Sequence, residues 1–249
     1  MIKQLVVNGC SYMEGYASGK GHIDLAEQLD IPSAKSLAIG GSANSRIIRT
    51  TIKHSYQTTV PTFYIMGLTF VSRSEVPVMK VDDDSTDFEG RWINPQNQEF
   101  ADRYDYFWNK DWSEKFVKFK LMTEVHSLID RTEDLMYSTL SAIHSLQARG
   151  HQVLVYQQAD TDYHCYLDTP RLQPYKTVKN IIDGFKWAAV LYQHEQGVEK
   201  SPKAGLGNFI GPKDVPDYIR HPKAGEHKVL NAFLTDYVKS NKILDRQNV

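Results

Sequence analysis

The chain has 249 residues, 41% of them hydrophobic, and a formal net charge of −1. This length and apolar content suffice for one α/β domain with a substantial core. Because the charges nearly balance, nothing in the composition favours nucleic acid or an anionic membrane surface, and neither is expected as a partner.

The chain contains two cysteines, Cys10 and Cys165. Such sparing use suits a reducing compartment and implies no disulfide framework. The apolar run before Asn8 is too short for a signal peptide, and no later run approaches the length of a membrane span. These features predict a cytoplasmic protein that crosses no membrane.

The first third of the chain predicts alternating strands and helices. Residues 2–8, with Leu5, Val6 and Val7 in succession, predict a strand buried on both faces. A short helix is expected over 22–30, a second strand over 35–39, and then a helix to about residue 56, capped by Ser42 or Asn44. The side chains expected to face the core from the two helices are Ile23, Leu25, Ala26, Leu29, Ile47, Ile48 and Ile52.

A third strand is predicted over 61–67, and an irregular insertion follows it over about 76–112. Aromatic residues are dense in this insertion, which indicates either a small satellite core or a surface that stacks on a ligand such as a sugar. Its candidate substrate contacts are Trp92, Tyr104, Trp108 and Trp112.

The rest of the chain returns to helical periodicity, then alternates again. Together the elements predict one domain, 1–249: a three-layer α/β/α sandwich with a mostly parallel, flavodoxin-like sheet. The expected elements are one or two helices over 114–149 stopped by Gly150, a fourth strand over 152–156, helices over 174–193 and 224–239, and a fifth strand over 207–211 or 217–220.

Ser11 stands immediately after the first predicted strand. The carboxyl ends of parallel strands form a ligand crevice where the strand order reverses, so a hydroxyl there is a candidate nucleophile. The alternative role for Ser11 is a helix N-cap. A serine nucleophile needs a base and a group that orients the base, and His221 with Asp217 a few residues upstream can supply both, with Asp214 in reserve. The alternative for His221 is a partly buried histidine bonded to backbone.

Four short blocks follow one another along the chain: Gly9-Cys10-Ser11, residues 38–44, Gly67-Leu68-Thr69, and Asp217 with His221-Pro222. In this order they resemble the blocks of the SGNH (GDSL-type) hydrolases, in particular phage and bacterial members. The resemblance implies an esterase or carbohydrate deacetylase without metal or cofactor. In it Ser11 attacks the carbonyl, His221 acts as base, and Asp217 orients His221.

The resemblance also implies an oxyanion hole built from the backbone N–H groups of Ser11 and Gly41, with a third donor at Thr69. Asn44 could supply a further donor or could be a turn residue. The chain has Cys10 and Thr69 where the family has aspartate and asparagine, and an extra residue lies between Asp217 and His221. The alternative function is therefore a non-catalytic binding or structural protein on the same scaffold. Cys10 itself is expected to be a packing residue.

Overall fold

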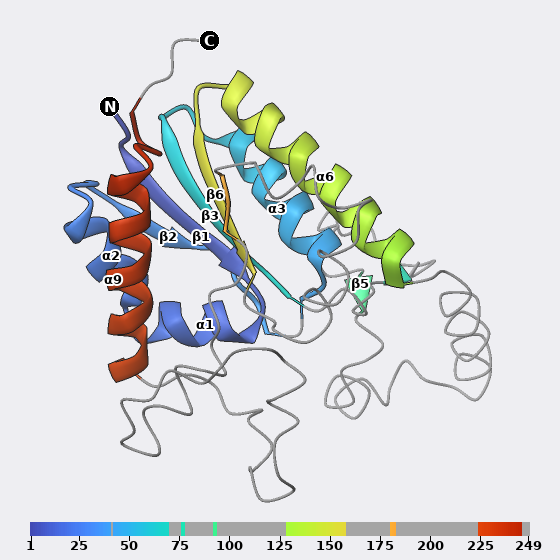
Figure 1. Ribbon diagram of the computed structural model, residues 1–249, viewed down its shortest axis with the longest axis horizontal. Helices are drawn as coiled ribbons and strands as arrows, with labels where there is room; N and C mark the ends of the chain where they lie inside the picture. Colours follow the sequence, from blue (N-terminus) through green and yellow to red (C-terminus); the bar gives the residue numbers. More distant parts are fainter. Residues whose placement is uncertain are drawn as a thin grey trace, which may run out of the picture.

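The computed structural model describes residues 1–40, 42–69, 76–77, 92–93, 128–157, 180–182 and 224–245. At the centre lies a five-stranded sheet in the order β2-β1-β3-β6-β7, and all four strand pairings are parallel (Figure 1). This is the flavodoxin-like order, so the predicted fold class is confirmed. The strands are β1 (Gln4–Gly9), β2 (Ala34–Ser36), β3 (Thr62–Leu68), β6 (Gln152–Gln157) and β7 (Ile181–Ile182).

Helices cover both faces of the sheet (Figure 1). On one face lie α1 (Ser11–Ser18), α2 (Gly21–Gln28) and α9 (Ala224–Ser240), and on the other lie α3 (Asn44–Gln57) and α6 (Leu128–Ala148). After α6 the chain turns at Gly150, whose φ of +79° explains why a glycine stops the helix there. None of the helices in the described ranges has the length and apolar character needed to cross a membrane.

The central strands β1, β3 and β6 are mostly apolar because both of their faces are buried. In β1, Leu5 and Val7 pack with α1, α2 and α9, whereas Val6 packs with α3 and α6. In β3, Phe63 and Tyr64 divide between the two cores in the same way. This two-sided burial explains why a run without polar alternation predicted the strands correctly.

Three details of the sequence prediction are wrong. Helix α1 was not predicted, because an eight-residue helix that buries only Met13 and Tyr16 has little periodicity to detect. In α2, Ile23 is 40% exposed, although it was expected to face the core. The fifth strand is β7, which lies inside the helix expected over 174–193 and pairs with β6. A two-residue apolar strand cannot be told from a helical segment by pattern alone.

Little of the predicted insertion lies within the described residues. Two short strands, β4 (Val76–Pro77) and β5 (Trp92–Ile93), pair antiparallel with each other. Tyr104, Trp108 and Trp112 lie outside the described residues, as do residues 114–127 before α6 and the strand candidates at 207–211 and 217–220.

Two buried histidines, His54 on α3 and His151 just before β6, flank the Tyr64 ring. His54 Nδ1 lies 2.9 Å from the Tyr64 hydroxyl, and His151 Nδ1 accepts a hydrogen bond of 3.2 Å from the Thr62 backbone N–H. Burial lowers the pKa of His54, and the nearby Lys35 and His151 lower it further. Burial also lowers the pKa of His151; Arg149 acts in the same direction, and a hydrogen bond with the Ser55 backbone opposes both.

These contacts predict a fold that loses stability in mild acid. A histidine with a lowered folded-state pKa binds its proton mainly in the unfolded chain, so stability should fall as the pH drops below about 6.5, the ordinary histidine pKa. His22, whose pKa is also lowered by burial, adds to the same trend. The melting temperature measured from pH 8 to pH 5 should therefore decline.

The contribution of the His54–Tyr64 pair to the acid sensitivity can be measured by substitution. His54→Gln should flatten the decline in melting temperature, whereas replacing the exposed His144 on α6 in the same way should not change it. Equal slopes in the wild type and in His54→Gln would show that His54 is not a source of the acid sensitivity.

Candidate functional site

The candidate site lies where the order of the sheet reverses, at the carboxyl ends of β1 and β3. From β1 the chain goes to β2 on one side, and β3 then pairs on the other side of β1. In the β1–β3 register, Gly9 stands opposite Gly67. Ser11 follows the first glycine by two residues, and Thr69 follows the second by two, so both leave the sheet at the same edge. This is the position at which open α/β sheets bind ligands.

A tight strand-to-helix turn places Ser11 at this edge. A Cβ atom on Gly9 would lie 2.8 Å from Met13 Cβ and 3.0 Å from the Gly67 carbonyl oxygen, so only glycine fits. Cys10, buried as expected, is the N-cap of α1, and Ser11 is the first helical residue. The alternative role of Ser11 as N-cap is therefore wrong.

Asn8 ties β1 to α3 directly beneath this turn. Its side-chain amide donates to the Ile47 carbonyl oxygen at 2.9 Å and lies 2.8 Å and 2.9 Å from the hydroxyl oxygens of Thr50 and Thr51. Its side-chain oxygen accepts from the Gly9 N–H at 2.9 Å. A single buried side chain thus fixes both the helix and the glycine turn. The sequence prediction missed this role, although a polar residue directly after Leu5, Val6 and Val7 in a buried strand was the available signal.

Asn44 connects α3 to the end of β3. Its side-chain nitrogen donates to the Thr69 carbonyl oxygen at 3.0 Å, and its side-chain oxygen accepts from the Thr69 N–H at 2.7 Å. The predicted capping of α3 by Ser42 or Asn44 is wrong: Ala43 is the N-cap, and no side chain caps the helix. Both polar groups are used elsewhere, since the Ser42 hydroxyl donates to the Ile39 carbonyl oxygen at 2.7 Å.

The Thr69 hydroxyl is buried at this junction. Its oxygen has no hydrogen-bond partner within the part of the chain that the structure describes. A buried hydroxyl that stays without a partner costs about 1–3 kcal/mol, so a hydrogen bond to the Thr69 hydroxyl would be favourable.

The loop after β2 closes over the start of α1. The Ile39 N–H donates to the Gly9 carbonyl oxygen at 3.3 Å, which holds the loop against β1. A Cβ atom on the next residue, Gly40, would lie 2.7 Å from Glu14 Oε2 and 3.6 Å from Ser11 Cβ. The absence of a side chain at Gly40 therefore allows the Glu14 carboxylate to lie over the loop beside Ser11. Glu14 was missed in the sequence, where its only signal is its position one helical turn after Ser11.

The structure brings three of the predicted site residues, Ser11, Asn44 and Thr69, to the same edge of the sheet. Gly41, Asp217, His221 and the reserve residue Asp214 lie outside the described residues, and of Trp92 only the backbone in β5 is described. His227 is buried in α9 and packs edge-on against the Tyr16 ring. Within the described ranges, no group of three or more potential ligand side chains is close enough to hold a metal ion.

Fold and site together define a doubly wound α/β protein with polar groups gathered at the topological switch point. Comparison with solved structures finds similarity to a proposed acylhydrolase from Bacteroides fragilis, with 11% identity over 96% of this chain and 88% of the other and a TM-score of 0.41. A member of the lipolytic protein G-D-S-L family from Veillonella parvula has 14% identity over 98% and 100% of the two chains and a TM-score of 0.40. No family model and no curated protein matches the sequence.

Proposed function

We propose that the protein is a serine hydrolase of the SGNH type that cleaves a carboxylic ester. The observation that carries the proposal is the position of Ser11, the first residue of a helix that leaves β1 at the topological switch point. Because Cys10 occupies the cap position, the Ser11 hydroxyl is not needed to cap the helix.

The surroundings of Ser11 suit the stabilisation of an oxyanion. The first N–H groups of an α-helix have no acceptor within the helix, so the Ser11 N–H is available to a ligand oxygen. In the proposed site this donor acts with the Gly41 N–H and the Thr69 hydroxyl. The side-chain amide of Asn44 forms hydrogen bonds with the Thr69 backbone and so holds Thr69 in place.

The proposed reaction is acyl transfer through a covalent intermediate. Ser11 Oγ forms a bond to the ester carbonyl carbon while His221 accepts the hydroxyl proton, and Asp217 orients the imidazole. Collapse of the tetrahedral intermediate breaks the bond to the alcohol, which leaves with the proton from His221. Water then attacks the acyl carbon while His221 accepts its proton; the bond to Ser11 Oγ breaks, the carboxylic acid is released, and His221 returns the proton to Ser11. A small acyl group on a carbohydrate is the proposed substrate, with Trp92, Tyr104, Trp108 and Trp112 as candidate stacking surfaces.

The test is covalent labelling combined with hydrolysis. A fluorophosphonate probe should add to the wild type, with the modification on the peptide that carries Ser11, and the same protein should hydrolyse a short-chain nitrophenyl ester. Ser11→Ala should lose both signals and keep its melting temperature; exposed Ser18→Ala on the same helix should keep both. A wild type that is neither labelled nor active would favour the non-catalytic alternative.

A further inference from the structure

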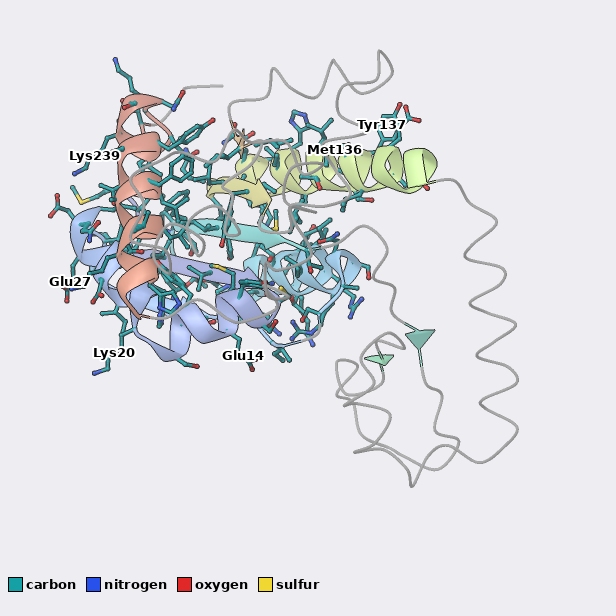
Figure 2. All side chains as sticks on the ribbon, turned by 60° about the horizontal axis from the view of Figure 1, so that its bottom comes forward. Glu14, Lys20, Glu27, Met136, Tyr137 and Lys239 are labelled. Atoms are coloured by element: carbon teal, nitrogen blue, oxygen red, sulfur yellow. The ribbon has the colours of Figure 1, made fainter. Side chains whose placement is uncertain are left out.

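Glu14 is a charged residue that shares a neighbour, Gly40, with Ser11; the Arg46 guanidinium binds the same loop through the Leu37 carbonyl oxygen and the Ser42 hydroxyl. Glu14 is exposed, lies in the first turn of α1, and packs its carboxylate against Gly40, which is also close to Ser11 Cβ. Among the described residues, none forms an ion pair with Glu14. Figure 2 shows Glu14 on α1, well separated from Glu27 on α2.

We propose that Glu14 determines substrate specificity by favouring esters that carry a positive charge near the scissile bond and disfavouring anionic esters. The proposal rests on the hydrolase function proposed above and narrows its substrate class. The preferred substrates would be esters of amino alcohols or of sugars with a free amino group. Glu14 takes no part in bond making or breaking and is not a catalytic residue.

The proposed selectivity is electrostatic in origin. Two unit charges a few ångströms apart at a protein surface interact strongly enough to change relative rates by roughly threefold to thirtyfold. Because Glu14 is exposed, the effect should weaken when salt shortens the range of the interaction. A carboxylate near the nucleophile also repels the phosphate and carboxylate groups that a helix N-terminus would otherwise attract. The site should therefore discriminate against anions despite its position at the start of α1.

Gly40 provides an independent means of moving the charge. An alanine there would place its Cβ 2.7 Å from the present position of Glu14 Oε2. Because that oxygen is the far end of a flexible side chain, the carboxylate should move away at little cost to the fold. Gly40→Ala should thus reduce the charge selectivity of the wild type and have no effect on selectivity in a Glu14→Gln background.

The experiment compares three thioesters that differ only in charge: acetylthiocholine, its uncharged tert-butyl analogue, and the thioacetate of mercaptopropionic acid. Thiol release gives kcat/KM for each. For the wild type at low salt, we expect kcat/KM for the cationic ester to be about tenfold higher than kcat/KM for the anionic ester, after each value is normalised for the intrinsic reactivity of the ester. Glu14→Gln should bring this ratio close to one, and Glu27→Gln, which removes the same charge from α2, should leave the ratio unchanged.

The outcomes separate the two proposals. Hydrolysis that depends on Ser11, with the same selectivity ratio in the wild type and in Glu14→Gln, would overturn the role of Glu14 and leave the hydrolase function standing. A ratio that shifts equally in Glu14→Gln and Glu27→Gln would also overturn it, because the effect would then come from net charge. Absence of any hydrolysis that depends on Ser11 would overturn the proposed function and this inference together.

Discussion

Replacing Thr69 with valine is expected to lower kcat/KM for ester hydrolysis by about tenfold to a hundredfold while leaving the melting temperature unchanged or higher. A single oxyanion donor is worth roughly 10²–10³ in rate in characterised enzymes, and a short hydroxyl should lie at or below that range. Stability should not suffer, because valine has nearly the same shape and removes a buried hydroxyl that has no partner in the described part of the chain.

The opposite directions of the two effects make this substitution diagnostic. A packing defect would lower activity and melting temperature together, whereas loss of a transition-state contact lowers kcat/KM alone. Thr69→Ser, which keeps the hydroxyl and loses a methyl group, should retain most of the activity and lose some stability. An active Thr69→Val protein would show that the hydroxyl does not contact the oxyanion.

Replacing Asn8 with alanine is expected to lower the free energy of unfolding by about 3–5 kcal/mol. The substitution removes buried hydrogen bonds to both α3 and the Gly9 turn, each worth about 1 kcal/mol, and leaves a cavity. It also leaves the buried Gly9 N–H without its acceptor.

Urea denaturation of Asn8→Ala measures this loss directly. Asn241→Ala is the matched control, because Asn241 makes a local side-chain bond to the Tyr237 carbonyl oxygen and is only partly buried. It should lose 1 kcal/mol or less. A similar loss in both variants would show that the position of Asn8 beneath the turn adds nothing beyond an ordinary hydrogen bond.

The sequence was most informative where burial is two-sided. The apolar runs of β1, β3 and β6 predicted the centre of the sheet, because strands covered on both faces need no polar alternation. The helix α3 was also predicted well, with Ile47 and Ile48 buried as expected. Local pattern fails for α1 and β7, which are short and depend on the elements against which they pack.

Of the predicted site residues, the structure places Ser11, Asn44 and Thr69 at one edge of the sheet, and their catalytic roles stay predictions. The rule that ligands bind at the carboxyl ends of parallel strands predicted the position of Ser11, whereas Thr69 was predicted as a donor only through the family resemblance. The role of Asn8 depends on hydroxyl groups about forty residues away, and that of Glu14 depends on the missing side chain at Gly40. Such contacts between distant segments leave no periodic signal in a single sequence.

The connection between β3 and β6 affects how the length of the chain can vary in evolution. β3 ends at Leu68 and its neighbour β6 begins at Gln152, with α6 as the one long helix described between them. The entropy of closing a loop grows only with the logarithm of its length, so doubling such a connection costs about 0.6 kcal/mol. Insertions and deletions between Thr69 and Leu128 should therefore be tolerated by the sheet. Homologous chains can be expected to differ greatly in length there while the Gly9–Gly67 pair stays fixed.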